Sequence, residues 1–183
     1  MTASLQARYS KGAMIFHWSI AIAVIVNWRL AEAAAHAAKA DAGWYMAQHK
    51  AIGISILILS IGRLAWRLTH PAPSLPVNYA AWERILARGL HIVFYVMLIG
   101  LPIGGWLASS YFGRGVDMFG LFTVPALPVS SDPEMGKTVI GFHGTGAEAL
   151  VYLVALHVLG ALKHTFYDRD GGIYRMLPFG KAG

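Results

Sequence analysis

Four runs of apolar residues dominate this 183-residue sequence, and each is long enough to cross a lipid bilayer. An α-helix rises about 1.5 Å per residue, so about 20 residues span the roughly 30 Å of hydrocarbon. Only 13% of the residues are charged, against about 25% in soluble domains. The pattern predicts an all-α fold, an integral membrane four-helix bundle, with helices at about 13–35, 49–68, 89–113 and 138–166.

The segments between these runs are short and contain proline, as in HPAPSLP at 70–76. We find no internal repeat, and we expect residues 1–183 to form a single domain. The first run resembles a secretory signal because basic residues precede it. It is longer than the 7–15 apolar residues of a signal and contains His17, Asn27 and Arg29. A retained first helix is therefore expected.

Lysine and arginine are concentrated on one side of the predicted membrane. Basic residues near the ends of spans are retained in the cytoplasm, and an inner N-terminus places ten of them inside and five outside. This distribution predicts that both termini are cytoplasmic, and it explains the formal charge of +6 without a nucleic-acid partner. The inner set is Arg8, Lys11, Arg63, Arg67, Arg84, Arg88, Lys163, Arg169, Arg175 and Lys181, and the outer set is Arg29, Lys39, Lys50, Arg114 and Lys137.

Histidine is the main metal ligand available, because the chain has no cysteine. One histidine near a helix end is often only an interfacial residue, but several in layers favour a functional interpretation. The outer layer contains His49 and His143, and the inner layer contains His17, His91, His157 and His164. We expect His36 and His70, in connecting segments, to be ordinary loop residues.

His143 and His157 are the most specific pair because they lie on one predicted helix, fourteen positions apart. That spacing is about 3.9 turns, so the two side chains lie within roughly 40° of one face and roughly 21 Å apart along the axis. One metal ion cannot bridge this distance, so two centres are predicted. His49 is the helical partner available to His143, whereas the partner of His157 stays open among His17, His91 and His164.

Imidazole pairs without thiolates suit heme iron, since a flat apolar macrocycle fits between helices and both axial positions accept neutral nitrogen ligands. A small transporter with a histidine-lined metal or proton path is the alternative from another class. The transporter predicts a colourless protein.

Several stretches match a known family: IFHW, HKAIGISILILSIGRLAWRLTHPAP, LHIVFYVMLIGLPIGG, FHGTGAEALVYLVALHVLGALKHTFY and YRMLP. Through them the chain resembles the bacterial cytochrome b561 family, whose members are four-helix membrane proteins with two b hemes. The resemblance covers nearly the whole chain and includes the fourteen-residue spacing. It implies that His17 and His157 are the axial ligands of the inner heme iron, and that His49 and His143 are those of the outer one.

The resemblance also implies a function. A close family member is a superoxide oxidase that passes electrons from superoxide to ubiquinone, and His91 and His164 match histidines that lie toward the quinone. The chain is thus expected to be an oxidoreductase of the bacterial inner membrane, surrounded by lipid, that connects a small anionic or protein donor on the periplasmic side with ubiquinone. The alternative is a heme-anchoring subunit of a larger dehydrogenase, without catalysis of its own.

Two charged residues at membrane depth, Arg29 and Glu148, are not obvious positions of the family pattern. We expect them to pair with each other, or Arg29 to meet a heme propionate. Lys50, Lys137 and Arg114 share the outer mouth with Arg29. Solvated loop charge is the more common role for such residues, and attraction of an anionic donor is the alternative.

Overall fold

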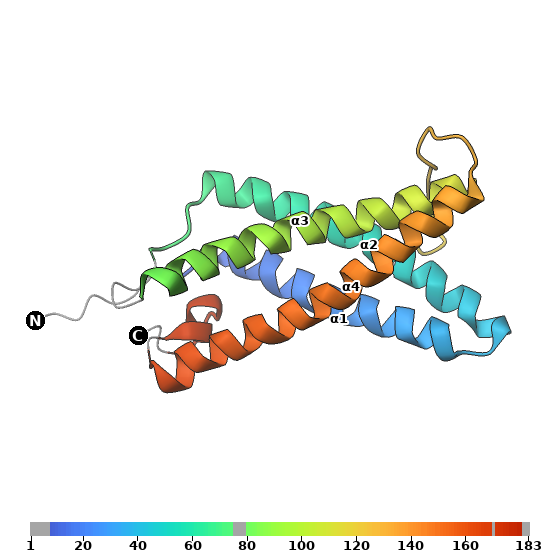
Figure 1. Cartoon of the computed structure of the whole chain (residues 1–183). Helices are drawn as coiled ribbons and strands as arrows, with labels where there is room; N and C mark the ends of the chain where they lie inside the picture. The colour runs from blue at the N-terminus through green and yellow to red at the C-terminus, as the bar shows by residue number, and fades with distance from the viewer. Residues whose placement is uncertain (1–7, 75–79, 170, 181–183) are drawn as a thin grey trace, which may run out of the picture.

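The computed structural model describes residues 8–74, 80–169 and 171–180 and confirms the predicted bundle of four long apolar helices (Figure 1). The helices are α1 (Lys11–His36), α2 (Lys39–Thr69), α3 (Ala81–Tyr111) and α4 (Pro133–Leu162). A π-helical turn, η1 (Lys163–Tyr167), continues α4, and a 3₁₀ turn, η2 (Gly172–Met176), follows. An antiparallel hairpin of β1 (Val116–Asp117) and β2 (Thr123–Val124) lies between α3 and α4.

All four helices begin before the predicted runs, because an apolar run identifies only the part that crosses hydrocarbon, whereas α3 ends at Tyr111, before the predicted end of its run at 113. Polar caps outside the runs decide where α1 and α4 begin. Ser10 Oγ accepts a hydrogen bond from the Ala13 N–H at 3.3 Å, and the Asp132 carboxylate accepts one from the Met135 N–H at 3.0 Å. Pro133 follows Asp132 at the first position of α4, where a missing N–H has no cost.

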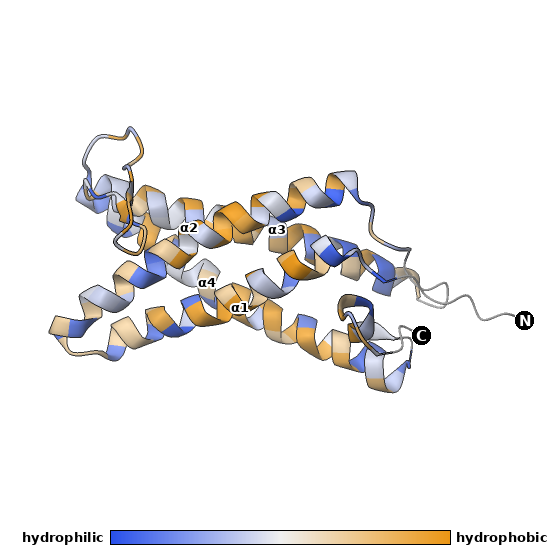
Figure 2. Cartoon of the chain, turned by 180° about the vertical axis from the view of Figure 1, so that it is seen from behind, coloured by the Kyte–Doolittle hydropathy of each residue, from blue (hydrophilic) through white to orange (hydrophobic). Residues whose placement is uncertain are grey.

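Apolar side chains cover the outside of the bundle. Figure 2 shows hydrophobic residues along the middle of the helices, and Ile58 and Val96 are examples of large side chains more than 60% exposed. Water would oppose such a surface, whereas lipid accepts it, and each helix satisfies its own backbone hydrogen bonds. By length and composition all four helices can cross a membrane. The chain is a multi-pass membrane protein.

Consecutive helices pack against each other along the chain, α1 on α2, α2 on α3 and α3 on α4. At one end, Val116 and Met118 of the hairpin segment form a small core with Ala51 and Ile54 of α2. We refer to this end as the outer end and to the opposite one as the inner end, following the predicted orientation.

The C-terminal segment returns to the start of α1 at the inner end. The Trp18 indole N–H donates to the Met176 carbonyl at 2.8 Å, and the Tyr9 N–H donates to the Arg175 carbonyl at 3.1 Å. The two ends of the described chain therefore lie on the same side of the bundle (Figure 1). That this side is cytoplasmic stays a prediction.

Candidate functional site

His49 of α2 and His143 of α4 face each other near the outer end. Their ring centroids are 6.0 Å apart and the ring planes are at 90°. Each Nδ1 donates to a backbone carbonyl, His49 to Asn27 at 3.0 Å and His143 to Leu101 at 2.9 Å. A carbonyl can only accept, so the proton is on Nδ1, and Nε2 is the unprotonated nitrogen that a metal needs.

Three imidazoles meet near the inner end, around His157 of α4. The centroid of its ring lies 6.4 Å from that of His17 on α1 and 5.9 Å from that of His91 on α3. His91 Nδ1 donates to the Ala87 carbonyl at 2.5 Å. Both distances suit a pair of ligands, so geometry does not choose between His17 and His91 as the partner of His157.

These spacings fit two imidazoles bound on opposite sides of one metal ion. A metal–imidazole bond is about 2 Å long, which places the centroids of two opposed rings roughly 6 Å apart. Within the described residues, no group of three or more histidine, aspartate or glutamate side chains could hold an ion by itself. A cofactor that supplies the remaining ligands to its own metal, as a porphyrin does, matches paired histidines.

Gly105 of α3 makes room for the ring of His143. A Cβ at position 105 would lie 3.2 Å from His143 Cε1, closer than ordinary van der Waals contact. A Cβ at the neighbouring Gly104 would meet no atom within 4 Å. Sequence reasoning missed Gly105, because its role depends on a contact between two helices.

Arg63 of α2 is a second residue that sequence reasoning missed. Its Nη1 lies 3.1 Å from His17 Nδ1, so His17 differs from His49, His143 and His91, whose Nδ1 atoms face carbonyls. Sequence contained a usable signal, since Arg63 follows His49 by fourteen positions, the spacing that joins His143 to His157.

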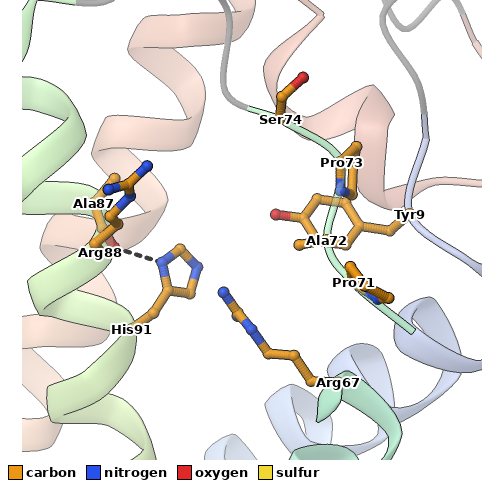
Figure 3. A pocket seen from close by; sticks show the side chains of 9 residues that line it. All are labelled: Tyr9, Arg67, Pro71, Ala72, Pro73, Ser74, Ala87, Arg88 and His91. Carbon is orange, nitrogen blue, oxygen red and sulfur yellow. Dashed lines mark hydrogen bonds between the residues drawn. The ribbon is translucent and has the colours of Figure 1, made fainter. Parts of the chain in front are cut away.

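A cavity of about 340 Å³ opens beside His91 at the inner end (Figure 3). The His91 ring points into it from α3 and the Arg67 guanidinium enters from α2, while the segment after α2 forms the opposite wall. The lining residues are Tyr9, Arg67, Pro71, Ala72, Pro73, Ser74, Ala87, Arg88 and His91. No acidic side chain is among them.

His164 does not line this cavity; it belongs to a charged cluster at the inner ends of α3 and α4. Its Nδ1 is 2.7 Å from Asp168 Oδ2, and Lys163 Nζ lies 2.9 Å from Asp168 Oδ2 and 2.8 Å from Glu83 Oε1. The hydrogen bond from Lys163 holds the pKa of the Asp168 carboxyl below its usual range. The cluster fastens the start of α3 to the end of α4.

Two expectations are wrong. Arg29 and Glu148 are both exposed, and the described residues contain no ion pair between them; Arg29 instead lies over the Trp28 ring at 5.7 Å. The alternative expectation, that Arg29 meets a heme propionate, stays a prediction. Similar depth did not place the two charges on facing surfaces. His36 is not a loop residue but the last residue of α1, where its Nδ1 donates to the Glu32 carbonyl at 2.9 Å.

Four apolar helices that bring imidazoles together at two depths, a pair at the outer end and a group of three at the inner end, point to a membrane protein of the b-type cytochrome class. The sequence bears this out, because residues 8–179 match the profile of the prokaryotic cytochrome b561 family. The chain belongs to that family, which implies heme b and a role in electron transfer.

Individual relatives cover almost the full chain. Cytochrome b561 homolog 2 of Escherichia coli is 32% identical over 173 residues, which is 93% of this chain and 91% of the relative. A protein of Yersinia pestis named probable superoxide oxidase CybB is 28% identical over 174 residues, 95% of this chain and 98% of its own length. Cytochrome b561 homolog 1 of E. coli is 25% identical over 173 residues, 93% of this chain and 97% of its own.

Proposed function

We propose that this chain is a di-heme b-type cytochrome of the bacterial inner membrane that transfers electrons between a periplasmic donor and ubiquinone. The observation that carries the proposal is the pair of imidazole contacts at opposite ends of α4, His49 with His143 and His17 with His157. When bound, heme supplies one-electron transfer. The chain supplies the ligands and fixes their separation through a single helix.

The ring nitrogens and their partners support the outer assignment most directly. Because the Nδ1 atoms of His49 and His143 are hydrogen-bonded to carbonyls, the rings are oriented and their Nε2 atoms are basic. For the inner heme we assign His17 and His157, following the family pattern, and leave His91 free for another role.

We assign His91 to a ubiquinone site in the inner cavity. The cavity volume of about 340 Å³ is within the range of about 300–1,000 Å³ common for small-molecule sites. Because the His91 proton is held on Nδ1 by the Ala87 carbonyl, the neutral ring offers Nε2 as an acceptor for a quinol hydroxyl, and only the protonated ring can donate a hydrogen bond to a quinone carbonyl. Through the family pattern His164 is proposed as a second residue that serves the quinone site; because it does not line this cavity, we propose that it acts indirectly, through its contact with Asp168.

For the outer end we propose superoxide as the donor, an anion that positive charge would attract. The basic residues at this end differ in their surroundings. Lys137 is offset by Glu134 at 2.7 Å, whereas Lys50 is half-buried next to His49 and donates to Ser109 Oγ at 3.2 Å. Lys50 is thus the cation best placed to draw an anion toward the outer heme.

Two measurements test the proposal. Reduced-minus-oxidised absorbance of the purified protein should show a b-type α band with two hemes per chain, and a colourless folded protein would exclude a cytochrome. Stopped-flow mixing with superoxide should reduce the hemes, and added ubiquinone should reoxidise them.

Lys50→Gln should slow the reduction of the hemes by superoxide and make its rate depend less on ionic strength, whereas Lys137→Gln should change neither the rate nor this dependence. A protein reduced only when a dehydrogenase partner is present would instead be an anchoring subunit.

A further inference from the structure

Arg63 carries a positive charge into the inner layer of the bundle. It lies on α2, half-buried, within a helix that can span the membrane. Its Nη1 is 3.1 Å from His17 Nδ1, and the ring of His17 lies with its centroid 6.4 Å from that of His157. Arg63 is therefore adjacent to the inner heme site of the proposed function.

No carboxylate of the described chain neutralises this charge. The ion pairs of the described residues involve neither Arg63 nor Arg67, which follows one turn later on the same face of α2. Arg67 lies in the last turn of α2, where the helix dipole favours a cation. Arg63 lies one turn closer to the middle of the membrane-spanning helix, where an unpaired charge is costly. The two like charges also repel each other.

The surroundings of Arg63 present hydrogen-bond donors and no acidic group. A small recess next to the main cavity is lined by Arg63 and Arg67 together with Tyr9 and Tyr95. The Tyr95 hydroxyl is buried beside the Arg63 guanidinium. Two guanidinium groups and two phenols around one recess form a receptor for an anionic oxygen group.

The contact with His17 points to the same conclusion. A histidine that binds iron through Nε2 carries its proton on Nδ1, and an N–H cannot accept a hydrogen bond from a guanidinium. When His17 serves as an iron ligand, Arg63 must therefore direct its N–H groups to another acceptor close by. His49 and His143 create no such requirement, since their Nδ1 atoms already donate to carbonyls.

We propose that Arg63 and Arg67 bind the propionate carboxylates of the heme at the inner site. The proposal rests on the proposed function, because it needs a heme at His17 and His157. Guanidinium groups pair with carboxylates through two parallel hydrogen bonds, which gives direction as well as charge. A lipid phosphate has similar chemistry, but the contact between Arg63 and His17 favours a group that is itself bound at His17.

The test compares heme with its dimethyl ester, which has the same iron and macrocycle but no free carboxylates. The full chain is produced in heme-limited cells, placed in phosphatidylcholine vesicles and loaded with either compound. The inner site of the unsubstituted chain should prefer heme over the ester by about tenfold or more. Arg63→Gln combined with Arg67→Gln should abolish this preference at the inner site and leave the outer site unchanged.

Arg88→Gln is the control, since Arg88 lines the main cavity together with Arg67 but lies on α3 and is not part of the recess around Arg63. It should retain the preference for heme, and Arg63→Lys should retain part of it. Normal loading of the outer site shows in each variant that the chain is folded. An unchanged ratio of heme to ester binding in the double variant would overturn the proposal.

The lipid alternative is tested by repeating the loading in vesicles that contain phosphatidylglycerol. Loss of bound phosphatidylglycerol in the double variant, with an unchanged ratio of heme to ester, would identify a lipid phosphate as the ligand and overturn the proposal. Failure of the unsubstituted chain to take up either compound at two sites would contradict the proposed function instead.

Discussion

The rings of His49 and His143 approach to a centroid distance of 6.0 Å with perpendicular planes, although 94 positions separate them in the chain. Four helices contribute to this contact. α2 and α4 carry the rings, and the carbonyls of Asn27 on α1 and Leu101 on α3 accept hydrogen bonds from their Nδ1–H groups. The outer pair is thus oriented by hydrogen bonds to two further helices, which is the preorganisation that a metal site requires.

Removal of one ligand from each pair should remove one heme from each site. His143→Ala should lose the outer heme and His157→Ala the inner one, so that each variant retains about half of the heme. The heme content per chain, measured as the pyridine complex, and redox titration of the remaining heme check this. His36→Ala is the control, because His36 is exposed at the end of α1. Loss of both hemes in one variant with intact helicity would argue against independent sites.

Alanine variants of His17 and His91 should show which of the two binds the inner heme iron together with His157. His17→Ala should lose the inner heme, whereas His91→Ala should retain both hemes and slow reduction of quinone, because His91 lines the inner cavity. Heme content and the rate of heme reoxidation by ubiquinone are the two measurements. Since His91 lies at ligand distance from His157, loss of heme in His91→Ala with retention in His17→Ala would reverse the assignment.

The cluster of Asp168, Lys163 and Glu83 should make stability depend on acid pH. The depressed pKa of Asp168 means that its contribution is present above the ordinary aspartate pKa of about 4 and is lost as the pH falls through the lower value of the folded state. Thermal unfolding in detergent should show a step in Tm below about pH 4 that Asp168→Asn makes smaller, while the remaining contact between Lys163 and Glu83 is retained. Asp41→Asn, at the opposite end of the bundle, should retain the step.

The helices and the histidine layers could be predicted from the sequence because both are periodic properties of a single segment. Length and hydropathy determine a membrane span. A separation of fourteen positions places His143 and His157 on one face of α4, so both layers could be predicted from that helix alone. The contact between His49 and His143 followed by elimination. The inner set could not be resolved in this way, and the structure explains why: His17 and His91 both lie within ligand distance of His157.

Contacts between helices were beyond sequence reasoning. The carbonyls of Asn27 and Leu101 are backbone atoms, which every residue has, so no residue type indicates that they orient a histidine. The depth of Arg29 and Glu148 could be estimated from residue numbers, but the direction in which each side chain points depends on how the helices rotate against each other. For this reason the predicted ion pair between them was wrong.

Gly105 and Gly104 are adjacent on α3 and provide a matched test of the space around His143. Alanine in place of glycine inside a helix adds about 0.5–1 kcal/mol of stability when the new methyl group has room. Gly104→Ala meets no atom within 4 Å and should raise Tm slightly with unchanged heme content. Gly105→Ala places its methyl group 3.2 Å from His143 Cε1, and the ring cannot withdraw because the Leu101 carbonyl and the predicted iron bond hold it.

Overpacking of this kind costs about 1–3 kcal/mol, which exceeds the gain in helix propensity. We therefore expect Gly105→Ala to lower occupancy of the outer heme and to leave the inner heme unchanged, as measured by heme content and redox titration. Equal behaviour of the two alanine variants would mean that the ring of His143 moves freely. The contact with His49 would then not be the rigid outer site inferred from the structure.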